Sequence, residues 1–530
     1  MTQQNAYRGI QVLFALGLII VIGFFVNPHM DEYVQFNSLS YLKPIFKYNT
    51  YNDGYEQYVI YILNHFKYRM SYAYIGNTSS LLYYPFYRLL PYGISNTVYS
   101  ILFWLLFCWL FKKAGQYSWN SILILLCFFP LVMQVLHDGG PVKMALLAYP
   151  LTAIFLRKLV TSISSNRKVL FAVLLSLLWF IALEDKVFFV YLFPGVLLFA
   201  VALLPEEYLS VTILKQNLKY LMVSLALFAV LGAVLLFSTV KGGADNTLFY
   251  ITSVIGANRA LLPNLTTAVK ERWYVFLAFF RYLDFPYYAN RNVFMVYNSL
   301  RFWLCVAAGG IVVIVLLEYR KIGTRLENAP RGRQILLLLS LLSLVVTFVL
   351  FGSTRLGHHY VFIWVPILAM VFSVEQTKPI VYKRINNLFL VYSMVSLLLV
   401  VFSKPIINNS SDLSGEIYHD LDSLNSRGGY IINYSSWNGY FIRELDPRKQ
   451  EIVTFLIHAD RNIKDESGRL TMFSKEYHMP VINVSEYPDT QDSLRKLFPE
   501  VKSMQHVSTQ THNHSIDILY FDGNNEKAGR

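Results

Sequence analysis

The chain has 530 residues, of which 55% are hydrophobic and 15% are charged, and its formal net charge is +13. Soluble domains carry about 25% charged residues, so this chain has too much apolar surface for one aqueous core. The same composition excludes a disordered, collagen-like or disulfide-rich secreted protein. The three cysteines all lie inside apolar runs, which also argues against a metal knuckle. We therefore expect a polytopic α-helical membrane protein.

Apolar segments of spanning length follow one another along most of the chain. A membrane-spanning helix needs about 20 mostly apolar residues, and we identify eleven such segments. The first could be a signal peptide, but its end at Val26-Asn27-Pro28 lacks a small-residue cleavage site, so we expect a retained helix. The predicted spans cover residues 10–26, 96–111, 119–136, 143–157, 168–183, 187–204, 220–240, 298–317, 334–352, 360–374 and 388–403.

Basic residues gather in every second connection between these spans. The positive-inside rule places those connections, and the N-terminus with Arg8, in the cytoplasm. The other short connections carry Asp138 and Glu184-Asp185-Lys186, and an odd number of spans puts the C-terminal tail outside. We expect a bacterial inner-membrane protein with a periplasmic or extracellular tail. The inward connections contain Lys112, Lys113, Arg157, Lys158, Arg167, Lys168, Lys215, Lys219, Arg320, Lys321, Arg325, Arg331, Arg333, Lys378, Lys383 and Arg384.

Two outward connections are long, and they belong to a predicted membrane domain that covers residues 1–403. Residues 27–95 and 241–297 are rich in tyrosine and phenylalanine. Both are typical of helices that lie along the outer membrane interface with an aromatic rim at the lipid headgroups.

The composition changes abruptly in the tail, residues 404–530. From Lys404 onward there are 14 basic and 18 acidic residues, whereas the rest of the chain is strongly basic. A helical stretch and four short β-like runs predict a small extracytoplasmic α/β domain. The helical stretch is Glu416–Leu424, and the β-like runs are Tyr430–Asn433, Glu451–Ile457, Pro480–Val484 and Ile516–Phe521.

An acidic motif follows the first predicted span directly, with His29, Asp31, Glu32 and Gln35 in close succession. Carboxylates at a membrane boundary are costly unless they are solvated, paired or functional. A neighbouring charge and partial desolvation raise a carboxylate pKa and make it a better general base. The alternative is a polar anchor that ends the helix.

Three further acidic residues, Asp138, Glu184 and Asp185, end predicted helices on the same outer side as Asp31 and Glu32. Five carboxylates would therefore meet at one depth, which favours a substrate site. Asp138 also stands in an Asp-Gly-Gly-Pro string that is an ordinary turn signal. Simple decoration of a loop is the alternative for Glu184 and Asp185.

Basic residues precede a late span on the same side, namely Arg355, His358 and His359. Arginine binds phosphate through two parallel hydrogen bonds, and histidine adds a hydrogen bond or a proton. Adjacent histidines on a helix point apart, and no cysteine or carboxylate is spaced to complete a metal shell, so we predict no metal site. An interfacial pair without a ligand is the alternative for the histidines.

These motifs together resemble the GT-C superfamily of integral-membrane glycosyltransferases. The family's acidic motif, His-x-Asp-Glu-x-x-Gln in several branches, is matched by His29, Asp31, Glu32 and Gln35. Asp138 matches an acidic residue after the third helix, and His358-His359-Tyr360 with Pro366 is similar to a basic and aromatic start of a late helix. The Trp-Trp-Asp motif of oligosaccharyltransferases is absent, which argues against that branch.

The resemblance implies inverting sugar transfer from a polyprenyl-phosphate donor, such as undecaprenyl phosphate, to a cell-envelope glycan or lipid. It implies that Asp31 is the general base, that Arg355 and His358 hold the departing phosphate, and that Glu32 and Asp138 orient hydroxyl groups. No cofactor is expected; the paired carboxylates are compatible with a divalent metal but do not require one. The expected partners are the lipid-linked donor, the acceptor and membrane lipids, and not nucleic acid.

A transporter or lipid flippase for an envelope glycan precursor is the main alternative, because membrane proteins of that class also use intramembrane acids and bases. Transporters usually place these charges near the bilayer midplane and have repeated halves. Here the acids gather at one boundary and the halves do not resemble each other. A non-enzymatic scaffold whose tail binds a partner is a third interpretation.

Overall fold

The computed structural model describes two separate units of this chain. The first contains the described residues up to Phe402, and the second those from Tyr430 onward. The described residues are 3–25, 59–62, 66–69, 76, 78–90, 92–137, 143–209, 211–240, 310–311, 313–317, 331–351, 362–373, 375, 379–402, 430–434, 452–455, 470–471, 474–475, 480–485, 491–507 and 515–521.

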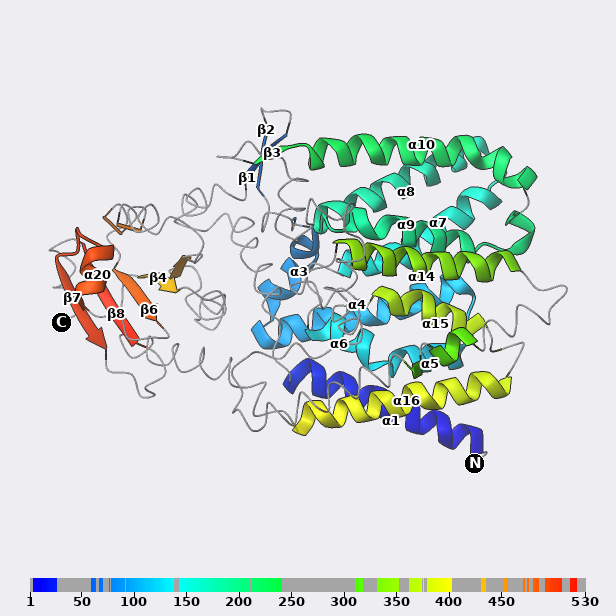
Figure 1. Ribbon diagram of the computed structural model, residues 1–530, viewed down its shortest axis with the longest axis horizontal. Helices are drawn as coiled ribbons and strands as arrows, with labels where there is room; N and C mark the ends of the chain where they lie inside the picture. The colour runs from blue at the N-terminus through cyan, green and yellow to red at the C-terminus, as the bar shows by residue number, and fades with distance from the viewer. Residues whose placement is uncertain are drawn as a thin grey trace. The chain divides into compact units, whose positions relative to one another are not determined.

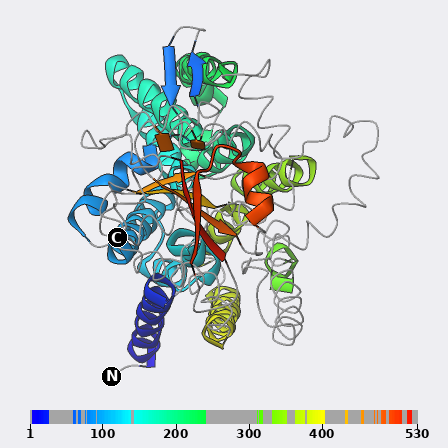
Figure 2. The same ribbon diagram turned by 90° about the vertical axis from the view of Figure 1, so that its left-hand side faces the viewer.

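The first unit is a bundle of apolar helices (Figure 1), and every predicted span overlaps helix in its described part. In both views α10 lies at one edge of the bundle, and α1 and α16 lie at the opposite edge (Figure 2). The helices are α1 (Gln3–Phe25), α3 (Thr78–Leu89), α4 (Tyr92–Gly115), α5 (Trp119–Leu126), α6 (Phe129–His137), α7 (Lys143–Thr161), α8 (Ser165–Asp185), α9 (Phe189–Ala202), the 3₁₀ turn η2 (Glu206–Leu209), α10 (Val211–Leu236), α14 (Arg331–Phe351), α15 (Trp364–Ser373) and α16 (Pro379–Phe402).

Among these helices, three are long and apolar enough to cross a membrane by themselves: Ile94–Gly115, Lys143–Thr161 and Lys215–Leu236. Shorter apolar helices cover Arg8–Gly23, Phe189–Ala202, Gly332–Thr347 and Trp364–Ser373. The fold is therefore that of a helical membrane protein, and the total of eleven spans stays a prediction.

The predicted span 119–136 is wrong as a single helix, because the chain breaks at Cys127 and Phe128 into α5 and α6. Pro130 accounts for the break. In a continuous helix its ring would clash with the carbonyl group of residue 126, whereas in the first turn of α6 its missing N–H costs nothing. The hydroxyl of Ser393 accepts a hydrogen bond from the Phe129 amide (3.1 Å), so the break is satisfied by α16.

Two helices begin nine residues before the predicted spans 220–240 and 388–403. The extra turns carry exposed cations such as Lys215, Lys383 and Arg384. A hydropathy pattern ends where charges begin, but a helix continues into the interface because its exposed charges remain in water.

The first long loop contains strands as well as a helix, which corrects the prediction of interfacial helices alone. β1 (Val59–Ile62) and β2 (Phe66–Arg69) form an antiparallel hairpin, and β3 (Thr239–Val240), where the second long loop starts, pairs with β1. The sequence of β1, Val-Ile-Tyr-Ile, is β-branched and aromatic throughout, which suits a strand. The helix predicted for this loop is represented by α3.

Aromatic side chains fill the core of the bundle, where Trp104, Trp179 and Trp364 are fully buried. The indole N–H of Trp179 in α8 donates to the hydroxyl of Thr152 in α7 (3.0 Å), so this polar atom is satisfied inside the core. This hydrogen bond links α7 and α8 away from the ends of both helices.

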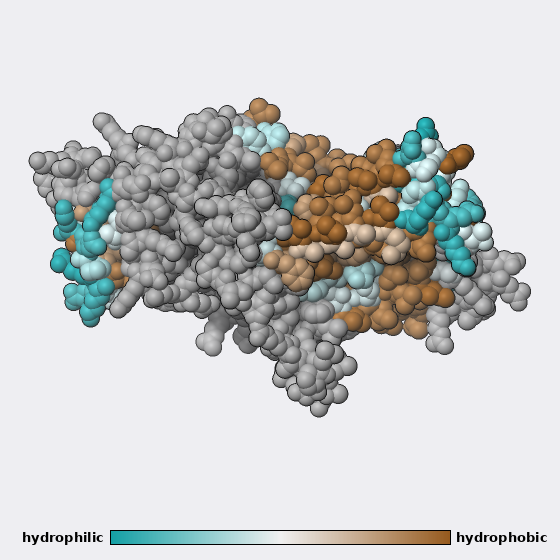
Figure 3. Space-filling model, turned by 90° about the horizontal axis from the view of Figure 1, so that it is seen from above, coloured by the Kyte–Doolittle hydropathy of each residue, from teal (hydrophilic) through white to brown (hydrophobic). Residues whose placement is uncertain are grey.

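The outside of the bundle is apolar, because large hydrophobic side chains of α1, α10 and α16 are exposed. Figure 3 shows a hydrophobic surface along the helices and hydrophilic residues at one end of them. Contiguous apolar surface of this kind is not stable in water and indicates contact with lipid. Examples are Leu13 (70% exposed), Val230 (61%) and Val391 (57%).

The second unit is a mixed five-stranded sheet of order β5-β4-β6-β8-β7 with one described helix, α20 (Gln491–Leu497). The first three of these strands are parallel, and β8 is antiparallel to both β6 and β7. The four predicted β runs are confirmed, β7 was not predicted, and Glu416–Leu424 lies outside the described residues. The strands are β4 (Tyr430–Tyr434), β5 (Ile452–Phe455), β6 (Val481–Ser485), β7 (Ser503–Val507) and β8 (Ser515–Tyr520).

The end of α4 offers a test of backbone strain. Gln116 has a φ of 55°, and the amide of Tyr117 donates to the carbonyl of Lys112 (3.2 Å), which closes a glycine-type helix end without glycine. We expect Gln116→Gly to stabilise the protein by up to about 1 kcal/mol, because glycine adopts this conformation freely. Gln116→Val should destabilise it. Thermal unfolding of the purified protein in detergent measures both, and equal shifts for the two variants would contradict the prediction.

Candidate functional site

The helices alternate in direction, so their ends form two groups with opposite character. At one end, which we call the basic end, Arg8 of α1 donates to Asn120 (3.0 Å) and Arg333 of α14 donates to the carbonyl of Leu204 (3.0 Å). The other end, which we call the acidic end, carries Glu184 and Asp185 at the last residues of α8. Where the structure describes them, the basic connections that the sequence predicts on one side therefore do meet at one end.

Glu184 and Asp185 are the predicted site residues that the structure describes, and they bind the start of α3. The Asp185 carboxylate accepts from the amide and the hydroxyl of Ser79 (both 2.7 Å). The Glu184 carboxylate accepts from the hydroxyl of Thr78 (2.6 Å) and from its amide (3.3 Å). Anions at a helix N-terminus satisfy free N–H groups and oppose the positive end of the helix dipole. Two residues of one helix thus cap another that is about a hundred positions away.

Gly76 makes this close approach possible. Its amide donates to the backbone carbonyl of Asp185 (3.1 Å). A Cβ atom at this position would lie 2.1 Å from the carbonyl oxygen of Glu184. This oxygen belongs to the backbone, so the clash could not be relieved by moving a flexible side chain. Gly76, two residues before α3, is therefore fixed to the end of α8 at a point where only glycine fits.

Asp185 lies beyond the predicted span 168–183 and has an unusual environment for a carboxylate. Burial, and secondly the neighbouring charge of Glu184, raise its pKa to about 7, although the Ser79 hydrogen bonds act in the opposite direction. A carboxylate that titrates near neutrality at a membrane boundary is a frequent property of functional sites, and it is also found in structural networks.

Two lysines at the acidic end are buried, and sequence reasoning did not single them out. Lys143, the first residue of α7, is fully buried beside the Tyr99 ring, with Nζ 5.2 Å from the ring centroid. Lys186, directly after α8, is also buried. A lysine at the first position of an apolar segment is the available signal, but hydropathy treats it as an ordinary boundary residue.

The remaining predicted site residues lie outside the described residues, but several helices next to them end or begin at the acidic end. Near this end Thr97 of α4 donates to the carbonyl of Gly23 in α1, and Thr347 of α14 donates to the carbonyl of Tyr191 in α9 (3.2 Å). The ends of α1 and α14 thus face the same side, and α7 begins near them, with Lys143 beside the Tyr99 ring of α4. The predicted residues concerned are His29, Asp31, Glu32, Gln35, Asp138, Arg355, His358 and His359.

Within the described part of the chain, no group of three histidine, cysteine, aspartate or glutamate side chains is placed to hold a metal ion. The carboxylates of Glu184 and Asp185 have hydroxyl and amide partners instead. The described chemistry of this end is hydrogen bonding and charge compensation.

No protein-family model matches the sequence, and no curated protein matches it. Among solved structures, the apo state of ArnT from Cupriavidus metallidurans is similar over 98% of both chains, with 13% sequence identity and a TM-score of 0.50. The same ArnT bound to undecaprenyl phosphate covers 97% of this chain and 98% of its own, with 15% identity and a TM-score of 0.47. The archaeal oligosaccharyltransferase AglB from Archaeoglobus fulgidus covers 91% of this chain and 69% of its own, with 10% identity and a TM-score of 0.38.

The match to apo ArnT extends over nearly the whole of both chains, including the tail. The chain therefore shares its fold with this ArnT structure. It is a multi-pass helical membrane protein, and its activity is a separate question.

The pKa of Asp185 predicts how stability depends on pH. Its folded-state pKa of about 7 lies above the usual value of about 4, so the folded protein keeps a proton that the unfolded chain releases. The free energy of unfolding should therefore fall as the pH rises from about 4 to 7. Each pKa unit corresponds to about 1.4 kcal/mol, so the total is a few kcal/mol.

We expect Asp185→Asn to remove most of this pH dependence, because the amide does not titrate. The measurement is the thermal unfolding midpoint of both proteins at pH 5 and pH 7.5. Asp492→Asn, which changes an exposed aspartate, is the matched control and should behave as wild type. An unchanged pH profile in the Asp185→Asn variant would contradict the assignment.

Proposed function

We propose that this protein is an inverting glycosyltransferase that transfers a sugar from a polyprenyl-phosphate donor to a cell-envelope glycan or lipid on the outer face of the membrane. The observation that supports it best is that α8 and three helices next to the other predicted motifs, α1, α7 and α14, end or begin at the acidic end. In this proposal, the motif after α1, the motif between α6 and α7 and the motif after α14 border the same end of the bundle.

In the proposed reaction, Asp31 takes the proton of an acceptor hydroxyl as the oxygen attacks the anomeric carbon. The bond between that carbon and the phosphate oxygen breaks, and polyprenyl phosphate leaves with the electron pair. Arg355, His358 and His359 stabilise the negative charge that develops on the phosphate. Glu32 orients the hydroxyl groups of the reactants. His29, Gln35 and Asp138 complete the substrate-binding residues of this proposal.

Glu184 and Asp185 take a supporting role in this proposal. Their carboxylates are engaged with Thr78 and Ser79, so they fix α3 and the first outer loop beside the end of α8. A rigid rim matters because a catalytic group that is displaced by about 1 Å loses on the order of a hundredfold in rate.

Lys143 adds a cation to the proposed site. A charged side chain that is fully buried at the boundary of a membrane protein is costly, and such residues are usually retained for function. Lys143 follows, by five positions, the Asp138 of the proposed substrate site. We assign it to compensating the donor phosphate, together with Arg355.

A lipid-linked donor suits the described surface, because its tail can lie against the exposed apolar side chains while its phosphate stays at the interface. ArnT from Cupriavidus metallidurans, which has this fold in its apo state, is also known bound to undecaprenyl phosphate. The donor class that we propose for this chain is the same. We choose a polyprenyl-phosphate donor because of the sequence motif and not because of this likeness.

Sugar transfer should depend on Asp31. Wild-type protein in detergent or nanodiscs should form a glycosidic bond from polyprenyl-phosphate sugars to one of a panel of lipid and glycan acceptors. Asp31→Asn should reduce the rate by about 10²–10⁴-fold, because it removes a general base. Asp53→Asn, which changes an aspartate of the same loop outside the motif, is the matched control and should keep the activity.

Two results would contradict this function. One is the same rate for wild type and a folded Asp31→Asn protein. The other is movement of an intact sugar-lipid across the membrane without a new glycosidic bond, which would favour the transporter or flippase.

Lys143 can be tested through the donor concentration dependence. Lys143→Met should raise the KM for the polyprenyl-phosphate sugar by about tenfold or more, because it removes one cation from the donor phosphate. Lys143→Arg should raise the KM less than Lys143→Met does, because the charge is retained. If both variants fold and keep the wild-type KM, Lys143 is a structural residue and has no part in donor binding.

A further inference from the structure

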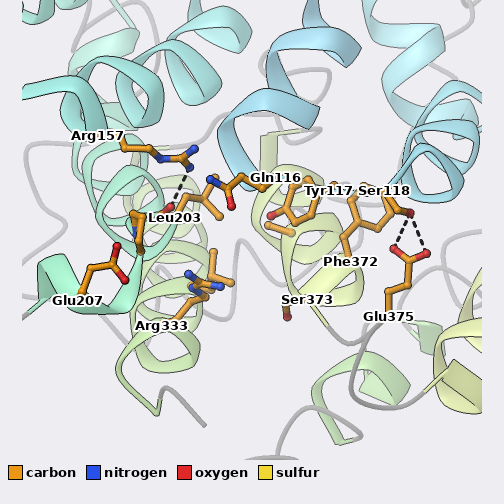
Figure 4. A pocket seen from close by; sticks show the side chains of 14 residues that line it. Gln116, Tyr117, Ser118, Arg157, Leu203, Glu207, Arg333, Phe372, Ser373 and Glu375 are labelled. Atoms are coloured by element: carbon orange, nitrogen blue, oxygen red, sulfur yellow. Dashed lines mark hydrogen bonds between the residues drawn. The ribbon is translucent and has the colours of Figure 1, made fainter. Parts of the chain in front are cut away.

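A cavity of about 380 Å³ lies at the basic end, where the helices α4, α7, α9, α14 and α15 meet. It is large enough for a small-molecule group, since ligand cavities usually begin at about 300 Å³. Figure 4 shows Arg157 and Arg333 on the same side of this space. The lining residues are Gly115, Gln116, Tyr117, Ser118, Arg157, Leu203, Pro205, Glu207, Arg333, Leu337, Ala369, Phe372, Ser373 and Glu375.

The two arginines are fixed in place by backbone carbonyl groups. Arg157 donates to the carbonyls of Lys113, Ala114 and Leu203, near the ends of α4 and α9. Arg333 donates to the next carbonyl, that of Leu204. Cations at helix C-termini are favourable, and this capping would be a sufficient explanation if it used the whole of both groups.

The capping contacts leave charge and donors unused. The Nε atoms of Arg157 and Arg333 are buried and have no hydrogen-bond partner within the described residues. Neither guanidinium group forms an ion pair with a described carboxylate, and the two groups are close enough to repel each other. Two half-buried cations that face one space without a counter-ion are stabilised when an anion occupies it.

The carboxylates that line the cavity do not supply this counter-ion. Glu375 points toward Ser118 in Figure 4, and its oxygens accept from the hydroxyls of Ser118 (2.7 and 2.8 Å) and Ser121 (2.8 Å). Glu207 is exposed and forms no ion pair with either arginine. The positive charge of the arginines is therefore open to an anion that enters from outside.

We infer that this cavity is a binding site for a phosphate group, held between Arg157 and Arg333. Arg333 uses only one of its N–H groups on Leu204 and keeps others for an anion, and Arg157 adds the second positive charge. A phosphate has enough oxygens on different sides to serve both arginines, whereas a carboxylate has only two oxygens in one plane. The phosphate belongs either to a free phosphate compound or to the headgroup of an anionic lipid in the adjacent leaflet.

This site is separate from the proposed sugar-transfer site, because it lies at the opposite end of the bundle. It does not depend on the glycosyltransferase proposal. With the basic end in the cytoplasm, as the charge pattern predicts, the phosphate group would come from the cytoplasmic side or the inner leaflet.

The first experiment uses the purified full-length protein in a neutral detergent, with inorganic phosphate as the probe and acetate as the comparison anion. Titration calorimetry should show phosphate binding that is at least tenfold tighter than acetate binding. Arg333→Gln should weaken phosphate binding at least tenfold. Arg384→Gln removes an exposed arginine of α16 outside the cavity, and it should leave binding unchanged.

Two further variants keep the test independent of folding defects. Arg157→Gln removes the second cation of the cavity, and it should also weaken phosphate binding. Glu207→Gln removes a negative charge from the cavity, and it should strengthen phosphate binding several-fold. A decrease in the Arg333→Gln variant and an increase in the Glu207→Gln variant cannot both arise from damage to the fold.

The second experiment distinguishes the sources of the phosphate. The protein is placed in nanodiscs of phosphatidylglycerol or of phosphatidylcholine, and thermal unfolding is measured for wild type, Arg333→Gln and Arg384→Gln. Stabilisation by phosphatidylglycerol that Arg333→Gln alone abolishes identifies a lipid headgroup. Phosphate binding in detergent without this lipid effect identifies a free phosphate compound. If neither arm responds differently to Arg333→Gln and Arg384→Gln, the proposed site does not exist.

Discussion

A charged side chain at the centre of a bilayer costs about 2.5–3.5 kcal/mol in insertion experiments, and this cost organises the whole bundle. The helices bury tryptophan and phenylalanine inside and expose leucine and valine to lipid, so the charges are displaced to the helix ends. Because the helices alternate in direction, the charges collect in two groups, one at each end of the bundle. The polar chemistry of the bundle is therefore concentrated at these two ends.

At the acidic end, carboxylates that are costly to bury also hold two parts of the fold together. Glu184 and Asp185 sit where α8 ends, and they are tolerated because Thr78 and Ser79 supply four hydrogen bonds. Gly76 then lets the backbone of the first loop approach α8 more closely than any other residue would. The loop that carries the acidic motif in sequence is thus attached firmly at its far end, beside α3.

The sequence predicted the parts of the fold that hydropathy governs and missed those that depend on tertiary contacts. Every predicted span overlaps a helix because burial of apolar surface in lipid leaves the backbone no alternative to helix. The break at Cys127 depends on Pro130 and on a hydroxyl from α16, and the β1–β2 hairpin depends on pairing with a distant strand. Pro130 is a local signal, but Ser393 of α16 and strand β3 lie far away in the sequence, so a local pattern does not reveal either contact.

The same limit applies to the basic end. From the sequence, Arg157 and Arg333 are two of many cations that orient the protein, and they are indistinguishable from Lys383 and Arg384. In the structure the latter two are exposed, whereas the former two are half-buried, bound to helix-terminal carbonyls and turned toward one cavity. Orientation alone requires a charge on the correct side and has no need of this burial. The burial is the feature that separates a binding group from a topological signal, and it makes the two ends of the bundle chemically distinct sites.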